Sequence, residues 1–210
     1  MTQHSERMNR TRQAVKMGML LPGMERVCYP YEGKVIFHMT DGTSGDVLAH
    51  FEKDNIIVLD AGLVAAAHFK GEMSGGVKML AIGTGATGNL LSPDAPQNTQ
   101  RKLNNEITRK AFSSTTYRTA EGVAVSYRTN IVDFTTTFGE SEAVGALNEM
   151  GLLVPYSLNP ATTNPINNGP TNYDASIDTE GLDLLCNYLS FSVISKPATA
   201  VLAITWRLTF

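Results

Sequence analysis

The sequence predicts a mainly β, β-sandwich-like protein with one short helix, an N-terminal arm and a long loop rich in Pro and Asn. Apolar and polar residues alternate in several segments, most clearly in AVLAITWRLTF at residues 200–210. Residues 60–70 have the composition and end signals of a helix. We therefore expect an arm over residues 1–33 and a β-rich domain over residues 34–210, with the loop at about 155–181.

The N-terminal arm is basic, and Pro22, Gly23 and Pro30 interrupt any regular element in it. Before residue 17, Glu6 is the single acidic residue, whereas the cations are Arg7, Arg10, Arg12 and Lys16. The whole chain has a net charge of −3, so the remainder is more acidic than this total. A basic tail on an acidic body can bind acidic protein or nucleic acid, and of the two we expect protein.

The first predicted strands form a hairpin. Residues 34–40, KVIFHMT, have strand character, and residues 48–60 return as one or two strands after a turn-rich connection. The predicted helix follows, with Asp60 as its cap and Gly71 as its stop. Its apolar side chains are Leu63, Val64, Ala67 and Phe69.

Residues 77–93 contain the spacing G-x-G-x-x-G at Gly83, Gly85 and Gly88. A dinucleotide site needs a helix after the third glycine, but Pro93 and Pro96 interrupt this segment. It also needs an acidic residue at the end of the next strand, and the candidate there, Glu106, lies in LNNEITRKA, which we predict to be helical or irregular. We expect a tight turn and no cofactor.

The later segments predict further strands. Val132, Phe134, Thr136 and Phe138 alternate with polar residues. At the C-terminus, one face carries Leu202, Ile204, Trp206, Leu208 and Phe210. We place Trp206 in the core or a subunit interface. Residues 185–195 precede this strand across Lys196 and Pro197, so we expect the two to pair antiparallel.

No arrangement of residues predicts catalysis or metal binding. The histidines have no metal-ligand spacing, although His38 and His50 could face one another across the hairpin. A G-x-S-x-G motif is absent, and the acidic residues near positions 140–149 are those of an ordinary strand end. Cys28 and Cys186 predict small buried residues, with a disulfide between them left open. No apolar run or leader predicts a membrane span or export, so we expect synthesis in the cytoplasm and no membrane partner.

Five short motifs follow one another between residues 82 and 210. Their residues are Ile82 to Gly85, with Gly83 between them; Leu103, Asn105, Glu106, Arg109 and Lys110; Phe138, Gly139 and Glu142; Glu149, Gly151 and Leu152; and Lys196, Trp206 and Phe210. This order resembles a group of tailed-bacteriophage virion proteins of the tail, tail-fibre or collar type. The resemblance covers about residues 55–210, whereas the arm and the long loop have no counterpart in it.

The resemblance implies a structural virion component of the tail, neck, collar or baseplate that assembles symmetrically with itself and neighbouring virion proteins. The low charged fraction, 18%, agrees with neutral contact surfaces. We expect Tyr156 and Tyr173 to make assembly contacts or to fix the long loop. Two alternatives stay open: a capsid decoration or cement protein, and a β-sandwich that binds a host glycan through Tyr156, Tyr173 or Tyr188. We do not expect an enzyme.

Overall fold

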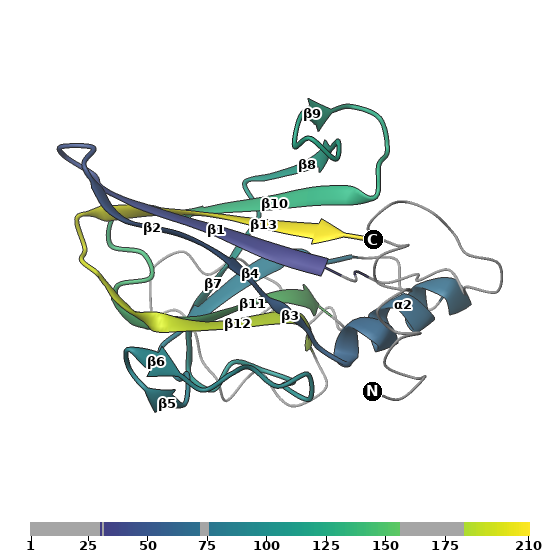
Figure 1. Ribbon diagram of the computed structural model, residues 1–210, viewed down its shortest axis with the longest axis horizontal. Helices are drawn as coiled ribbons and strands as arrows, with labels where there is room; N and C mark the ends of the chain where they lie inside the picture. The colour runs from purple at the N-terminus through teal and green to yellow at the C-terminus, as the bar shows by residue number, and fades with distance from the viewer. Residues whose placement is uncertain (1–29, 31, 72–75, 156–182) are drawn as a thin grey trace, which may run out of the picture.

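The computed structural model describes residue 30 and residues 32–71, 76–155 and 183–210, without the side chains of Pro155 and Asp183. These residues form two antiparallel β-sheets packed face to face, with helix α2 at one end (Figure 1). The predicted mainly β, sandwich-like fold with one short helix is thus confirmed for the described chain.

Sheet A has six strands in the order β2-β1-β13-β10-β8-β9. Their bounds are β1 Glu32–Asp41, β2 Val47–Asp54, β8 Ser114–Arg118, β9 Ala124–Val125, β10 Ile131–Phe138 and β13 Ala200–Thr209. The predicted hairpin is β1 with β2, and β13 lies between β1 and β10. On β13 the side chains of Leu202, Ile204, Trp206 and Leu208 are fully buried, as the alternation predicts, whereas Phe210 is 39% exposed.

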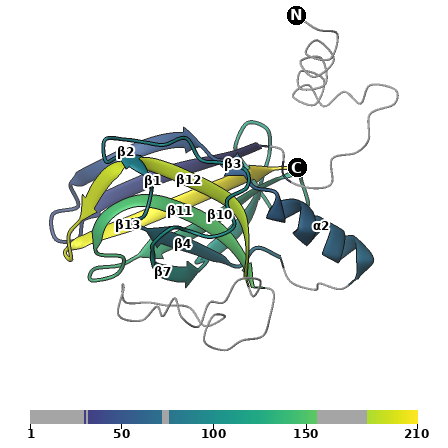
Figure 2. The same ribbon diagram turned by 90° about the horizontal axis from the view of Figure 1, so that it is seen from below.

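Sheet B has five strands in the order β3-β12-β11-β4-β7. Their bounds are β3 Ile56–Ile57, β4 Met79–Gly83, β7 Glu106–Ala111, β11 Gly145–Pro155 and β12 Asp183–Lys196. A separate small hairpin joins β5 Gly88–Asn89 to β6 Ser92–Pro93, below sheet B in Figure 1. Viewed from below, α2 extends beyond the end of both sheets (Figure 2).

The main core lies between the two sheets. Alternate residues of each strand point inward, and the phenyl rings of Phe37, Phe51 and Phe191 stack with centroids 4.8 to 5.9 Å apart. On β4, Leu80 and Ile82 join this core, whereas their neighbours join a second cluster on the other face of sheet B. That second cluster comprises Val58, Met79, Ala81, Leu103, Leu153, Leu185 and Tyr188.

Helix α2 spans Asp60–Lys70, as predicted, and Gly71 ends it with a left-handed φ of 77°. The predicted cap is wrong: Leu59 is the N-cap, and no side chain caps the helix. The carboxylate of Asp60 instead accepts a hydrogen bond from the Arg101 guanidinium. The expected apolar face is also partly wrong, because α2 buries Ala61 and Val64 while Leu63 and Phe69 are exposed.

Two further expectations are corrected. Residues 106–111 form strand β7 rather than a helical or irregular segment, because Ile107, Thr108 and Arg109 are all buried against β4. Strands β12 and β13 do not pair with each other. The connection at residues 197–199 carries the chain from sheet B to sheet A, so both strands take central positions in different sheets.

The two ends of the sandwich differ, and Figure 1 shows them at left and right. At the closed end, three connections meet, at residues 42–46, 139–144 and 197–199. Backbone hydrogen bonds join them, from Gly42 N–H to Thr199 O at 2.8 Å and from Ser141 N–H to Ala198 O at 2.7 Å. The open end holds Pro30, α2 and Phe210. No helix in the described ranges is long and apolar enough to cross a membrane.

Candidate functional site

The turn after β4 does hold an anion, but the anion is a side chain of the protein itself. The carboxylate of Glu149, fully buried on β11, accepts hydrogen bonds from three backbone N–H groups. Gly85 and Asn105 donate to Oε1 at 2.9 and 2.8 Å, and Asn104 donates to Oε2 at 3.0 Å. Gly85 N–H, the one donor of the three that belongs to the glycine motif, is thus satisfied by a side chain of the protein and not by a pyrophosphate.

The glycines of this turn are required by that close approach. A Cβ on Gly85 would lie 2.3 Å from the backbone nitrogen of Asn105 and 2.7 Å from Glu149 Oε1. A Cβ on Gly83 would lie 2.4 Å from Asn105 O. All three distances are shorter than the contact distance between non-bonded atoms. Because glycine has no Cβ, the turn at Gly83 and Gly85 can pack against the segment before β7.

Tyr188 on β12 completes the shell of Glu149. Its hydroxyl donates to Glu149 Oε2 at 2.8 Å, and its ring is only 3% exposed. Burial and the neighbouring carboxylate both raise the pKa of Tyr188, so the phenol stays protonated as a donor. A glycan platform needs an exposed aromatic face, so the structure contradicts that role for Tyr188.

A second motif pair, Glu106 and Arg109, is an ion pair on β7. The Arg109 guanidinium is fully buried and donates to both carboxylate oxygens of Glu106, with Nη2 to Oε2 at 2.9 Å. A bidentate pair of this kind is geometrically specific. It stabilises the outer strand of sheet B and presents neither group to solvent.

Four other motif residues meet at the closed end, namely Lys110, Gly139, Glu142 and Lys196. Lys196 is 1% exposed, and its ammonium donates to the backbone oxygens of Gly139 and Ala200 at 3.1 and 2.6 Å. Glu142 accepts from Gly139 N–H at 2.8 Å and pairs with Lys110. Burial holds the pKa of Lys196 below its usual value, although the charges of Glu142 and Glu140 act in the opposite direction.

The fold therefore brings together residues from different motifs, which are far apart in the sequence, in two internal clusters. One holds Gly83, Gly85, Asn105, Glu149 and Tyr188, and the other holds Lys110, Gly139, Glu142 and Lys196. Tyr188 belongs to the first cluster but was not among the motif residues, because an isolated tyrosine in a strand gives no signal for such a role. Trp206 lies fully buried in the main core.

A third charged group lies on the outer face of sheet A. Asp133 on β10 is buried between two arginines that are each 29% exposed. Arg207 donates to its two oxygens at 2.7 and 2.9 Å, and Arg118 donates to Oδ2 at 2.8 Å. The hydrogen bonds to Asp133 raise the pKa of Arg207, so this guanidinium stays charged. Sequence analysis did not identify it because Arg118, Asp133 and Arg207 are distant in sequence.

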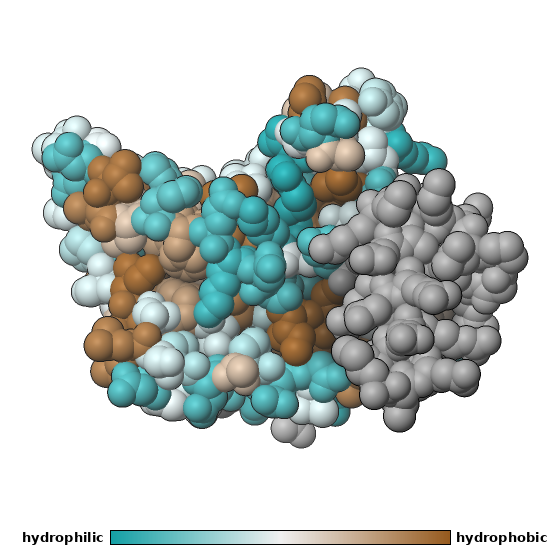
Figure 3. Space-filling model, viewed as in Figure 1, coloured by the Kyte–Doolittle hydropathy of each residue, from teal (hydrophilic) through white to brown (hydrophobic). Residues whose placement is uncertain are grey.

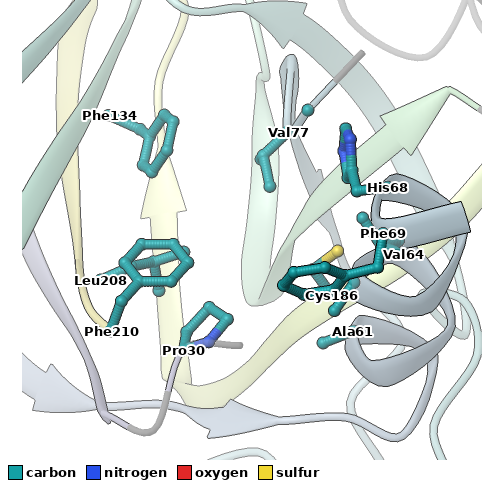
Figure 4. Close-up of a pocket in the computed structure, with 12 residues that line it drawn as sticks. Pro30, Ala61, Val64, His68, Phe69, Val77, Phe134, Cys186, Leu208 and Phe210 are labelled. Carbon is teal, nitrogen blue, oxygen red and sulfur yellow. The ribbon is translucent and has the colours of Figure 1, made fainter. Parts of the chain in front are cut away.

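The open end contains an apolar pocket of about 420 Å³. Figure 4 shows Phe134, Leu208, Phe210 and Pro30 on one side and residues of α2 on the other. The α2 side includes Ala61, Val64, His68 and Phe69, with Cys186 and Val77 nearby. Phe69 is 74% exposed, so its ring is available at the rim. Such a pocket can accept an apolar side chain or segment.

Cys186 lines this pocket as a free, buried thiol. Burial, together with the charge of Asp60, raises the pKa of Cys186 to about 12. The thiol is therefore almost entirely protonated near neutral pH, which agrees with the predicted role as a small buried residue.

A polar hollow of about 440 Å³ lies beside the apolar second cluster on the outer face of sheet B, and both include Tyr188. Its lining includes Asp94, Gln97, Gln100, Asn104 and Ser190. The hydroxyl of Ser190 already donates to Asp94 O at 3.0 Å, and Gln100 binds Lys102 O and Asn104 Oδ1. Many of its polar groups are thus engaged with one another.

Several predicted contacts lie outside the described residues: Arg7, Arg10, Arg12, Lys16, Tyr156, Tyr173 and Cys28. Within the described ranges, no group of three or more His, Cys, Asp or Glu side chains is placed to hold a metal ion. Figure 3 shows polar and apolar patches interspersed over the visible face. No protein-family model matches the chain, and no curated protein is similar to it.

Proposed function

We propose that this protein is a structural component of a tailed-phage virion, in the tail, neck, collar or baseplate. It acts by symmetric assembly with itself and with neighbouring virion proteins. We expect the protein to be synthesised in the host cytoplasm and then to be incorporated into the virion. The order of motifs that resembles the phage group supports this proposal, and those motif residues form the internal clusters of one rigid sandwich.

The observation that carries the proposal is the apolar pocket at the open end. Pro30, the first described residue, lines it. The arm contains the apolar run MGMLL at residues 17–21. We assign this run, from a neighbouring copy, as the occupant of the pocket. Burying it would stabilise the contact by about 25 cal/mol per Å² of apolar surface removed from water.

The reach of the arm fits exchange between copies. The nine residues from Pro22 to Pro30 can span up to about 30 Å when extended, at roughly 3.3 Å per residue. Within that reach, the run can enter the pocket of an adjacent subunit. Head-to-tail contacts of this kind close into rings or continue as stacks, which are the symmetries of a phage tail.

The test is the mass of the protein in solution, measured by light scattering over a range of concentrations. We expect a defined oligomer for the full chain. The substitution Phe69→Asp places a charge at the pocket rim without removing a buried side chain, and we expect it to shift the protein to monomer. Deletion of residues 1–24 should have the same effect, because it removes the apolar run.

Leu91→Asp is the matched control, because Leu91 is 76% exposed and lies beyond β5, away from the pocket. It should assemble like the unmodified chain. A full-length protein that stays monomeric at every concentration would contradict self-assembly. Equal effects of Phe69→Asp and Leu91→Asp would contradict the pocket as the contact.

The capsid-decoration alternative predicts trimers rather than rings, and the same mass measurement separates the two. The glycan-binding alternative has the polar hollow as its candidate site. That hollow has hydrogen-bonding groups, but its one aromatic residue, Tyr188, is buried. The described residues therefore favour assembly over glycan recognition.

A further inference from the structure

Two histidines lie directly opposite each other on the hairpin of sheet A. His38 on β1 and His50 on β2 are paired in the strand register. Their Nδ1 atoms are 3.4 Å apart, and their rings meet edge to face with centroids 5.5 Å apart. This separation is long for a hydrogen bond between two nitrogens.

The same separation matches a shared metal ion. Two nitrogen ligands at 2.0–2.1 Å from a tetrahedral ion lie about 3.3–3.4 Å apart. Neutral imidazole is a preferred ligand of Zn²⁺ and of the neighbouring divalent transition metals. We propose that His38 and His50 bind a divalent transition-metal ion, with Zn²⁺ as the representative, through their two Nδ1 atoms.

The surroundings leave room for the ion. The residue that faces His38 on its other side is Ala203 of β13, whose methyl group is the smallest side chain with a Cβ. The pair is exposed to solvent, and β2 is the edge strand of sheet A. Two protein nitrogens thus fill half of a tetrahedral shell, while the other two positions are accessible to water or to a neighbouring molecule.

The local charges are nearly balanced. Glu52 on β2 forms an ion pair with Lys34, and the charge of Arg207 also acts on that carboxylate. Because the negative charge of Glu52 is already matched by cations, it does not compete strongly for the ion. Both histidines must be neutral with their remaining proton on Nε2, because a protonated Nδ1 has no lone pair for the ion.

Calorimetric titration of the full chain with ZnCl₂ at pH 7.5, in a buffer that does not chelate metals, tests the proposal. His4→Asn should serve as the background, because His4 lies near a chain end and could bind metal by itself. We expect one Zn²⁺ per chain, and at least tenfold weaker binding in His38→Asn and in His50→Asn. The loss in the double variant should be smaller than the sum of the two single losses in binding free energy, since either substitution alone breaks the chelate.

His68→Asn is the matched control, because His68 is an exposed histidine on α2. Its affinity should equal that of the background protein. A second readout is the visible absorption of Co²⁺, which should show a tetrahedral spectrum that either hairpin variant abolishes. Unchanged Zn²⁺ affinity in His38→Asn or His50→Asn would overturn the proposal, as would two weak and independent sites. Circular dichroism verifies that the variants are folded.

Discussion

The closed and open ends of the sandwich are held by different kinds of interaction. At the closed end the ammonium of Lys196 is buried and donates to the carbonyl groups of Gly139, in one connection, and of Ala200, the first residue of β13. At the open end the pocket is lined by aliphatic and aromatic side chains and by the free thiol of Cys186. A buried charge fixes geometry because it has few acceptable arrangements, whereas an apolar surface accepts many partners.

This difference separates two tasks within one fold. The closed end determines how the connections between the sheets are arranged, and its polar groups are satisfied by one another. The open end exposes the rim of an apolar pocket. We therefore expect substitutions at the closed end to act mainly on folding stability, and substitutions at the open end to act mainly on association.

The largest effect is expected for Lys196→Met. It removes the ammonium donor of Ala200 O and of Gly139 O, which keeps its bond from Glu142 N–H at 3.3 Å, and a hydrogen bond from a charged group contributes about 1.5–3 kcal/mol. We expect a loss of about 3 kcal/mol in the free energy of unfolding, measured with urea. Lys34→Met is the control, because its ion pair with Glu52 is solvent-exposed and should contribute less than about 1 kcal/mol. Equal losses for the two variants would show that the buried lysine does not lock the closed end.

An intermediate effect is expected for Asp133→Asn on the outer face of sheet A. The substitution removes the negative charge between Arg118 and Arg207. Because both guanidinium groups are partly exposed, water can solvate them, and we expect a loss of about 1–2 kcal/mol. Urea unfolding in 0.05 and 1 M salt measures it, and the loss should shrink at high salt. If Asp133→Asn lowered the free energy of unfolding more than Lys196→Met does, the partly exposed ion pairs would contribute more to stability than the buried lysine, contrary to our expectation.

The last prediction concerns the open end and requires no substitution in it. The rate at which a reagent labels the Cys186 thiol reports how well the pocket buries this side chain. In a Cys28→Ala background, we expect a thiol reagent at pH 8 to react about a thousandfold more slowly with the folded than with the unfolded chain. The reason is that burial raises the pKa of Cys186 to about 12, so little thiolate is present.

The pH dependence of this reaction follows from the same shift. The labelling rate should rise about tenfold for each unit between pH 8 and 10, since the thiolate fraction grows in that proportion below the pKa of about 12. The raised pKa also means that the folded state binds this proton more tightly than the unfolded state. The contribution to stability is thus complete below about pH 8.5 and is lost as the pH rises toward 12. A rate equal to that of the unfolded chain would contradict a buried thiol.

Much of the fold was predictable from local patterns. Alternation located β10 and β13, turn residues located the hairpin of β1 and β2, and Gly71 marked the end of α2. Strand β7 was missed because Glu106, Arg109 and Lys110 give the segment a polar composition. Their charges are neutralised by partners that only the folded chain supplies, namely each other and Glu142.

The pairing of β12 and β13 was wrong for a related reason. A short connection between two apolar strands favours a hairpin, but the same length also suffices to cross from one sheet to the other. In the folded protein, the hydrogen bond from Lys196 to Gly139 O joins this crossing to the connection at residues 139–144. The internal clusters could not be predicted for the same reason, since each joins residues that are tens of positions apart.

The central positions of β12 and β13 have a consequence for synthesis on the ribosome. Without residues 183–210, sheet A would separate into β2-β1 and β10-β8-β9, and β3 would lose its partner in sheet B. A nascent chain that has exposed only the preceding residues thus has separate groups of two or three strands, β2-β1, β10-β8-β9 and β11-β4-β7, with unpaired edges. Closure of the sandwich must wait for these late residues, and until then the unpaired strands are candidates for chaperone binding.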